Sequence, residues 1–258
     1  LTRWQPCQHP KKLRPKVRAK PTHSRIHSQL DNAELAFFLS GLVAVSRPII
    51  SQWFRARPNI EIKADASPVT IADKNVEIAF RTAIASRFRS DDILGEEHDF
   101  KRGDGSTDYQ WVIDPIDGTK AFVSGKPTFG SLVGLLDSGW PVAGFCDMPI
   151  LDELYIGLGR TAWLNGEVIS TSDSRDLSTC RLATTSPDNF SPGGLVAFNR
   201  VSALAGITNY GGDCHNYALL AAGHIDLVIE DCLAPHDIVG IIPIMQAAGA
   251  FVTDLQGN

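Results

Sequence analysis

The residues Trp111-Val112-Ile113-Asp114-Pro115-Ile116-Asp117-Gly118-Thr119-Lys120 indicate the fold most directly, because an apolar run there leads into a turn that carries two carboxylates. The apolar residues at its start predict a short buried strand. Pro115 fixes one backbone dihedral, and Gly118 allows the chain to turn sharply. Asp114 and Asp117 are therefore expected at the end of a strand, where they can share a cation. Ligands that offer only oxygen suit a hard ion such as Mg²⁺.

Further acidic motifs also lie beside apolar runs. Glu96 and Glu97 follow the short run Ile93-Leu94 and Gly95, and Asp237 opens an apolar segment near the end of the sequence. Taken alone, Asp-Pro-x-Asp-Gly is most often a surface turn, and a pair of glutamates is most often a solvated edge. The motifs together, in this order, favour a shared site, and a resemblance to a known family favours it further.

The chain resembles the inositol monophosphatase-like superfamily of Mg²⁺-dependent, lithium-sensitive phosphomonoesterases, from about residue 31 to the end. The matching motifs are Lys63-Ala-Asp65, Pro68-Val-Thr70-Ile-Ala-Asp73, Gly95-Glu96-Glu97, Asp114-Pro-Ile-Asp117-Gly-Thr119, Asp237 and Ala247-Ala248-Gly249. The resemblance implies an α/β fold (α+β layered), an alternating α-β-α-β-α sandwich with mixed sheets. We therefore expect one phosphatase domain over residues 31–258.

The resemblance also implies a set of metal ligands. Hydrolysis of a phosphate ester needs charge neutralisation, an activated water and help for the departing alkoxide, and divalent ions held by carboxylates can supply all of these. One Mg²⁺ would be bound by Glu96, Asp114 and the main-chain carbonyl of Ile116. A second would be bound by Asp114, Asp117 and Asp237, so that Asp114 bridges the pair. Two or three ions are expected in total.

Other matching residues would act on the water and the phosphate. By resemblance, Asp73 and Thr119 would be catalytic and orient the attacking water, because a hydroxyl can accept from water while it donates to a carboxylate. Asp73 alone would be interpreted as a helix N-cap, and both roles can hold at once. The amides of Gly118 and Thr119 would bind the phosphate. Lys63 and Asp65 are expected to be secondary site residues, with a surface salt bridge as the alternative.

Within the superfamily, the chain is most similar to the histidinol-phosphate phosphatase branch. The similar segments are 118–127, Phe129-Gly130, Thr184-Thr185-Ser186-Pro187, Gly211-Gly212-Asp213-Cys214, 217–223 and 226–230. Histidinol phosphate carries an ammonium and an imidazole, so Asp213 and Glu230 are the matching candidates for substrate binding. Both could also be ordinary acids of a loop and a strand end, and an inositol phosphatase would also use a polar acceptor at Glu230.

His236 is the residue at which the chain departs from the family. Trp widely, or Tyr in the histidinol-phosphate branch, precedes the acid that matches Asp237. An imidazole is smaller and more polar than either ring. We interpret His236 as a packing residue and not as a ligand, because Mg²⁺ prefers oxygen.

The resemblance implies hydrolysis of L-histidinol phosphate to L-histidinol and phosphate, in histidine biosynthesis, by attack of a metal-activated water. An inositol monophosphatase or a nucleotide 3′-phosphatase of the same fold is the alternative, and a non-catalytic relative is a further one. The expected partner is a small-molecule phosphate ester, with neither nucleic acid nor membrane. A homodimer is expected by family analogy alone.

Charge is distributed unevenly along the 258 residues. Residues 1–30 carry eight Lys or Arg and no acid, which leaves 16 basic against 29 acidic residues, a formal charge of −13, in the remainder. The basic, proline-rich leader is expected to be disordered, with an organelle-targeting remnant or a wrongly assigned gene start as alternatives. The acidic remainder argues against a general binder of polyanions.

The five cysteines are scattered and odd in number, which indicates free thiols in a reducing compartment. A cytoplasmic location is expected unless the leader directs the chain to an organelle. No apolar run reaches the ~20 residues that span a bilayer, and Leu35 to Val45 is the nearest. The family usually continues through another strand and helix beyond Asn258, which is consistent with a truncated C-terminus.

Local patterns predict the elements that position these motifs. The expected elements are a capping box at Asp31 ahead of a helix toward Trp53, an amphipathic helix from Asp73, an antiparallel meander over 131–164, a hairpin turn at Asn165-Gly166, a strand near 182–184, a helix over 215–222, a strand at 227–229 and a last helix from His236 with Pro243 inside it.

Overall fold

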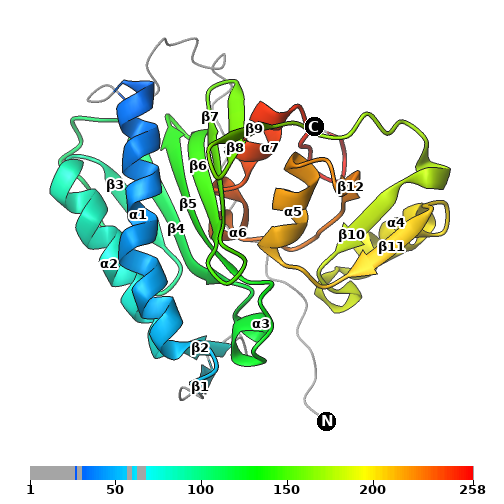
Figure 1. Cartoon of the computed structure of the whole chain (residues 1–258), viewed down its shortest axis with the longest axis horizontal. Helices are drawn as coiled ribbons and strands as arrows, with labels where there is room; N and C mark the ends of the chain where they lie inside the picture. The colour runs from blue at the N-terminus through cyan, green and yellow to red at the C-terminus, as the bar shows by residue number, and fades with distance from the viewer. Residues whose placement is uncertain (1–26, 28–30, 57–59, 63–67, 258) are drawn as a thin grey trace.

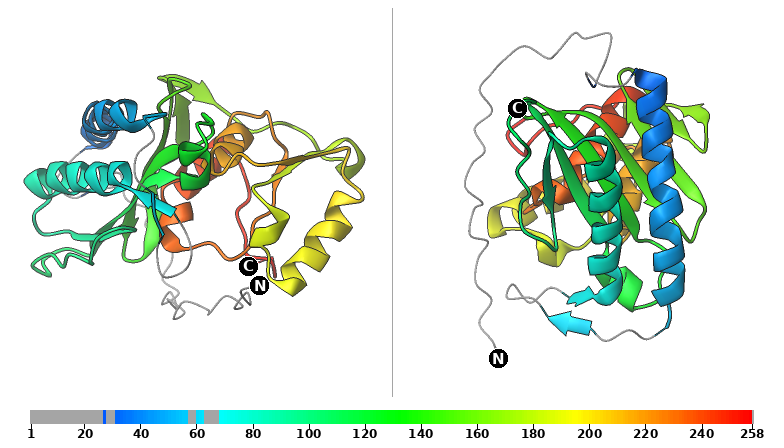
Figure 2. Two further views of the ribbon diagram at one scale, coloured as in Figure 1. Left: turned by 90° about the horizontal axis from the view of Figure 1, so that it is seen from below. Right: turned by 90° about the vertical axis from the view of Figure 1, so that its left-hand side faces the viewer.

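Layers of helix and sheet alternate across the molecule in a computed structural model that describes residues 27, 31–56, 60–62 and 68–257 (Figure 1). Helices α1 (Asn32–Trp53) and α2 (Ile71–Arg87) lie side by side on one face of the large sheet (Figure 2). The opposite face carries α5 (Cys214–Ala221), α6 (Pro235–Val239) and α7 (Ile242–Ala248). A smaller sheet and then α4 (Pro192–Ser202) follow. The predicted α-β-α-β-α sandwich is confirmed.

The large sheet has seven strands in the described part of the chain, and their order in the sheet follows their order in the sequence. The strands are β3 (Asp92–Gly95), β4 (Tyr109–Asp117), β5 (Gly130–Asp137), β6 (Trp140–Met148), β7 (Glu153–Leu158), β8 (Thr161–Leu164) and β9 (Glu167–Ile169). β3 runs parallel to β4, and every later pair is antiparallel. Asn165 and Gly166 have φ of 50° and 89°, as the predicted two-residue hairpin turn requires.

The motif Asp114 to Asp117 is not the turn after a strand that the sequence pattern predicts. It belongs to β4, which pairs with β5 as far as Asp117. The pairing shifts register between Asp114 and Asp117, because Pro115 has no N–H to donate to the ladder. Ser131 holds the irregular stretch by donating to the Pro115 carbonyl at 2.7 Å.

Smaller elements complete the described fold. Its second sheet has three parallel strands, with β10 (Arg181–Thr184) between β11 (Ile207–Tyr210) and β12 (Leu227–Val228). The sequence patterns do not predict β11 or α4. The remaining elements are the antiparallel pair β1 (Ile60–Ile62) and β2 (Pro68–Thr70), the short helix α3 (Thr119–Val123) and 3₁₀ turns at Leu177–Thr179 and Pro187–Asn189.

Helix α1 begins at the predicted capping box, in which Asp31 accepts from the Glu34 amide and Glu34 accepts from the Asp31 amide. Among the described residues it is the one helix whose length and composition would suffice to cross a membrane. Its apolar residues Leu35, Leu39, Leu42 and Ile50 are buried in the core with residues of α2 and the large sheet. The predicted run Leu35 to Val45 is thus part of a longer helix that packs within the fold.

The last helical segment is two helices and not the single helix predicted from His236. Pro243 lies in the first turn of α7, where its missing N–H has no cost, and the chain breaks before it. The junction lies close against β5 and β6. A Cβ on Gly134 would lie 2.6 Å from the Val239 carbonyl oxygen, and one on Gly144 would lie 2.2 Å from that of Gly240. This close packing fixes the height of α6 above the sheet.

The packed part of the chain includes a residue ahead of the predicted boundary at residue 31. His27 is fully buried, and its Nε2 lies 3.0 Å from Oδ2 of Asp91, which is buried as well. Its ring stacks on Tyr109 with centroids 4.2 Å apart. The other residues of the predicted leader, and the motif residues Lys63 and Asp65, lie outside the described residues.

Candidate active site

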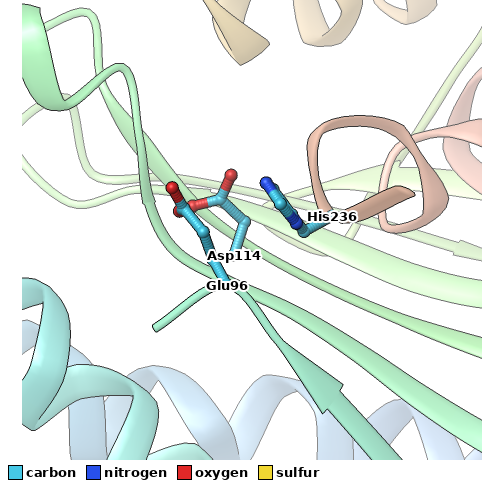
Figure 3. Close-up of side chains that lie close together, drawn as sticks. All are labelled: Glu96, Asp114 and His236. Carbon is cyan, nitrogen blue, oxygen red and sulfur yellow. The ribbon is translucent and has the colours of Figure 1, made fainter. Parts of the chain in front are cut away.

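Acidic side chains converge at one end of the large sheet. Asp114 and Asp117 come from β4, Glu96 follows β3, and Asp237 lies in the first turn of α6. Ligand atoms of Asp114, Asp117 and Asp237 lie within 4.8 Å of one another, and those of Glu96, Asp114 and His236 form a second such group (Figure 3). Asp114 is common to both groups. The structure therefore brings together all four carboxylates that the resemblance implies as ligands.

Burial and the repulsion of neighbouring acids make Asp114 unfavourable as a bare anion. Asp114 is 2% exposed, and its Oδ1 has no hydrogen-bond partner among the described residues. Burial, followed by the charges of Glu96, Asp117 and Asp237, raises the pKa of Asp114 well above its usual range. A divalent cation would remove the repulsion and give Oδ1 a partner. The donor set therefore fits a metal ion.

Asp117 is held by the start of α5. The Cys214 amide donates to its Oδ2 at 2.6 Å. Burial raises the pKa of Asp117 well above its usual range, and the charges of Asp213 and Asp237 add to this, whereas the bond from Cys214 opposes it. The Asp237 carboxylate in turn accepts from the Ala234 amide at 2.6 Å and so closes the first turn of α6. These bonds fix one carboxylate oxygen of Asp117 and one of Asp237.

Glu77 of α2 fixes the backbone around Glu96. Its carboxylate is fully buried and accepts from the Glu97 amide at 2.6 Å and the His98 amide at 3.2 Å. Arg81 donates to Glu77 at 2.6 Å and to the His98 carbonyl at 2.9 Å. Sequence reasoning missed this role. The available signal is an acidic residue on the apolar side of α2, with an arginine four residues later.

Asp73 and Thr119 lie together, as the resemblance implies. The Thr119 hydroxyl lies 3.4 Å from Asp73 Oδ1 and 3.1 Å from the Ile116 carbonyl oxygen. Asp73 is not the N-cap of α2, because the helix begins earlier and Thr70 caps it. Asp73 completes the capping box by accepting from the Thr70 amide at 2.8 Å and hydroxyl at 2.6 Å. Burial raises the pKa of Asp73 above its usual value despite these bonds.

Asp213 lies against the turn that precedes α3. Gly118 has a φ of 83°, and a Cβ there would lie 2.9 Å from Asp213 Cγ. Asp213 itself has a φ of 47°, a strained value for a residue with a side chain. Burial raises the pKa of Asp213 to about 6, whereas the nearby charges of Lys120 and Lys126 lower it. The predicted substrate acid is therefore next to the predicted phosphate turn.

Tyr217 lies near enough to the carboxylate cluster to be affected by its charges, and Glu230 lies near Tyr217 and Asp213. Glu230 accepts from the Thr185 amide at 2.5 Å, and burial raises the pKa of its carboxyl group. The Tyr217 hydroxyl is buried and has no hydrogen-bond partner within the part of the chain that the structure describes. Burial, then the charges of Glu230, Asp117 and Asp237, raises the pKa of Tyr217. Tyr217 therefore lies beside the candidate site, and sequence reasoning did not identify it, because nothing in its local sequence relates it to these acids.

Comparison with known proteins identifies the family. The sequence profile described as the inositol monophosphatase family matches residues 31–258. The chain is 44% identical over 235 residues to the bifunctional phosphatase IMPL2, chloroplastic, of Arabidopsis thaliana, across 90% of this chain and 68% of that one. It is 32% identical over 199 residues to a histidinol-phosphatase of Chlorobaculum parvum, across 76% of each.

Solved structures agree with this assignment. An inositol monophosphatase from Zymomonas mobilis superposes with a TM-score of 0.79 at 38% identity, over 88% of each chain. The inositol monophosphatase TM1415 of Thermotoga maritima superposes with a TM-score of 0.77 at 29% identity, over 87% of each chain. Relatives named histidinol-phosphatase support the predicted branch. The chain therefore belongs to the inositol monophosphatase family of metal-dependent phosphatases.

Proposed function

We propose that this phosphatase hydrolyses L-histidinol phosphate to L-histidinol and phosphate with Mg²⁺ as its cofactor. The observation that carries the choice of ester is the Asp213 carboxylate beside Gly118. In histidinol phosphate the ammonium group is separated from the ester oxygen by two carbons. An anion next to the phosphate turn therefore suits this substrate, whereas a pocket for a neutral polyol has less need for a second anion. Glu230, whose carboxyl group is affected by the charge of Asp213, is the candidate partner of the imidazole.

The ligands of the proposed metal site are the carboxylates of Glu96, Asp114, Asp117 and Asp237 and the main-chain carbonyl of Ile116. When bound, two or three Mg²⁺ ions would neutralise the phosphoryl oxygens and the departing alkoxide. The protein holds the ligand oxygens in place before the substrate binds. Hydrogen bonds at the start of α5 and in the first turn of α6 do this for Asp117 and Asp237.

Asp73 and Thr119 are proposed to orient the attacking water. The Thr119 hydroxyl can donate to Asp73 or to the Ile116 carbonyl and still accept a hydrogen bond from water. The raised pKa of Asp73, caused by burial, suits a group that shares a proton during the attack. The amides of Gly118 and Thr119, at the left-handed start of α3, are proposed to bind a phosphate oxygen.

The test is phosphate release with Mg²⁺ from histidinol phosphate, inositol 1-phosphate and a nucleotide 3′-phosphate. We expect the highest kcat/KM for histidinol phosphate and its loss in Asp114→Asn. Asp213→Asn should lower kcat/KM for histidinol phosphate much more than for inositol 1-phosphate. Preference for another ester would refute the proposed substrate but would not contradict the proposed metal site.

An inositol monophosphatase is the second candidate, since the chain is 31% identical to a fructose-1,6-bisphosphatase/inositol-1-monophosphatase of Thermotoga maritima. A homodimer is proposed by family analogy, and sedimentation of the purified chain tests it. The proposed location is cytoplasmic. Organelle targeting is the alternative, because one relative bears the description chloroplastic in its name.

A further inference from the structure

His236 faces the carboxylate cluster and does not point away from it. It lies in the first turn of α6, directly before Asp237, and Figure 3 shows one of its ring nitrogens turned toward Asp114. A nitrogen of His236, an oxygen of Glu96 and an oxygen of Asp114 all lie within 4.8 Å of one another. Ligands on opposite sides of one ion, each about 2.1 Å from it, would be about 4 Å apart, so little movement closes this group on a metal.

A second observation indicates that the group is built for a ligand. Asp114 is 2% exposed, and its Oδ1 has no hydrogen-bond partner among the described residues. A buried carboxylate oxygen without a partner is costly unless something binds it. The His236 ring is partly covered as well, with 22% of its side chain exposed. Its Nε2 lies 3.5 Å from Asp237 Oδ1, which is beyond a good hydrogen bond.

The two groups around Asp114 differ in the chemistry of their donors. Asp114, Asp117 and Asp237 offer oxygen alone, which suits Mg²⁺. Glu96, Asp114 and His236 offer two oxygens and an imidazole nitrogen. Imidazole favours transition metals such as Zn²⁺ over Mg²⁺. The two positions should therefore select different metals.

We propose that His236 is a metal ligand, and that with Glu96 and Asp114 it forms a position for a transition-metal dication such as Zn²⁺, Co²⁺ or Mn²⁺. The neighbouring position of Asp114, Asp117 and Asp237 takes Mg²⁺. This proposal replaces the interpretation of His236 as a packing residue, and it replaces Mg²⁺ as the ion held by Glu96 and Asp114. It rests on the metal site of the proposed function, but not on its substrate. The competing explanation is that His236 is protonated and only offsets the charge of the acids.

Pulsed electron paramagnetic resonance of bound Mn²⁺ separates these explanations. The full chain is stripped of metal, loaded with Mn²⁺ and measured for coupling to ¹⁴N, and then again after labelling with ¹⁵N-histidine. Direct ligation predicts a nitrogen coupling that changes with the label. Bound Mn²⁺ without a histidine coupling would overturn the proposal. This measurement needs no variant, so a misfolded mutant cannot obscure it.

Variants then assign the nitrogen. His236→Tyr restores the aromatic residue of the branch and should abolish the coupling. His98→Gln tests the rival imidazole, whose Nδ1 lies 3.3 Å from Glu77, and His224→Gln is a matched exposed control; both should keep the coupling. Coupling that survives in His236→Tyr, or disappears in His98→Gln, refutes the assignment.

Affinity gives an independent readout. In competition with a chelator, His236→Tyr should bind Zn²⁺ about tenfold or more weakly, since even residues that only support a ligand cost about 10 to 100-fold when lost. Its affinity for Mg²⁺ should be unchanged by calorimetry. Equal losses for both metals would overturn the division between the two positions. Histidine coupling in a protein that hydrolyses none of the esters would keep this inference and refute the proposed function.

Discussion

Replacing Glu77 by Gln tests how the fold of α2 controls the geometry of the proposed metal site. The Glu77 carboxylate is buried, and its two oxygens have different partners. Oε2 accepts from the Glu97 amide at 2.6 Å, whereas Oε1 accepts from Arg81 at 2.6 Å and from the His98 amide at 3.2 Å. The variant keeps the size of the side chain. It removes the charge and replaces one acceptor by a donor.

The expected loss of stability and of metal affinity follows from these hydrogen bonds. The glutamine side chain has one oxygen, which keeps the most hydrogen bonds if it lies beside Arg81 and the His98 amide. The NH₂ group of the glutamine then faces the Glu97 amide, and two hydrogen-bond donors oppose each other. Loss of a hydrogen bond to a charged group, with a buried N–H left unpaired, should cost about 2–4 kcal/mol of unfolding free energy. The backbone beside Glu96 should relax away from α2. Metal affinity should then fall about 10 to 100-fold, as when partners of metal ligands are lost.

Urea unfolding of the metal-stripped protein and calorimetric titration with Mg²⁺ measure the two effects separately. Glu61→Gln is the matched control, because Glu61 is 65% exposed and pairs with Lys74 at 2.5 Å on the surface. The control should change stability by less than about 1 kcal/mol and leave metal affinity unchanged. A Glu77→Gln protein that is less stable but binds Mg²⁺ normally would refute the positioning role.

Three further changes test other parts of the structure. His27→Ala should lower the unfolding free energy by about 2–4 kcal/mol in urea, since it removes ring stacking and a hydrogen bond to buried Asp91; no change would show that the packed fold begins after this residue. Tyr217→Phe should raise KM for the phosphate ester several-fold without loss of stability, because the hydroxyl has no partner in the described chain. An unchanged KM would make Tyr217 a packing residue. Hydrogen bonding from Arg181 lowers the pKa of Asp226 below its usual value. The ionised Asp226 therefore stabilises the fold above about pH 4, and this stabilisation is lost as the pH falls through the folded-state pKa. Asp226→Asn should therefore be less stable than the wild type at neutral pH, and the difference measured in urea should close in acid; a constant difference would contradict this.

Local sequence patterns predict much of the fold because they act over a few residues. The capping box at Asp31 and the Asn165-Gly166 turn each depend on neighbours in the chain, and both are confirmed. The acids Asp114 and Asp117 share one motif, so their proximity needs no knowledge of the tertiary fold. Asp237 has no such local signal, and only the family pattern relates it to them.

Features that depend on distant contacts are the ones that sequence patterns miss. Nothing near His27 indicates burial, because its partner Asp91 lies 64 residues away. The division of the last helix at Pro243 depends on how closely α6 packs on the sheet. Likewise, the orientation of His236 toward Asp114 follows from the position of α6 and not from its neighbours in the sequence.

The convergence of Glu96, Asp114, Asp117 and Asp237 has a consequence for the lifetime of the protein. Glu96 and Asp237 are separated in the sequence from the motif that carries Asp114 and Asp117, and they meet it only in the folded chain. There the acids would repel one another unless cations are bound between them. An ion that binds the folded chain alone stabilises it by about 2.7 kcal/mol when its concentration is a hundred times its dissociation constant. Chelation should therefore lower Tm as well as activity. With the proposed metal site, the free ion level of the surrounding compartment would set both how fast this phosphatase turns over and how long it survives.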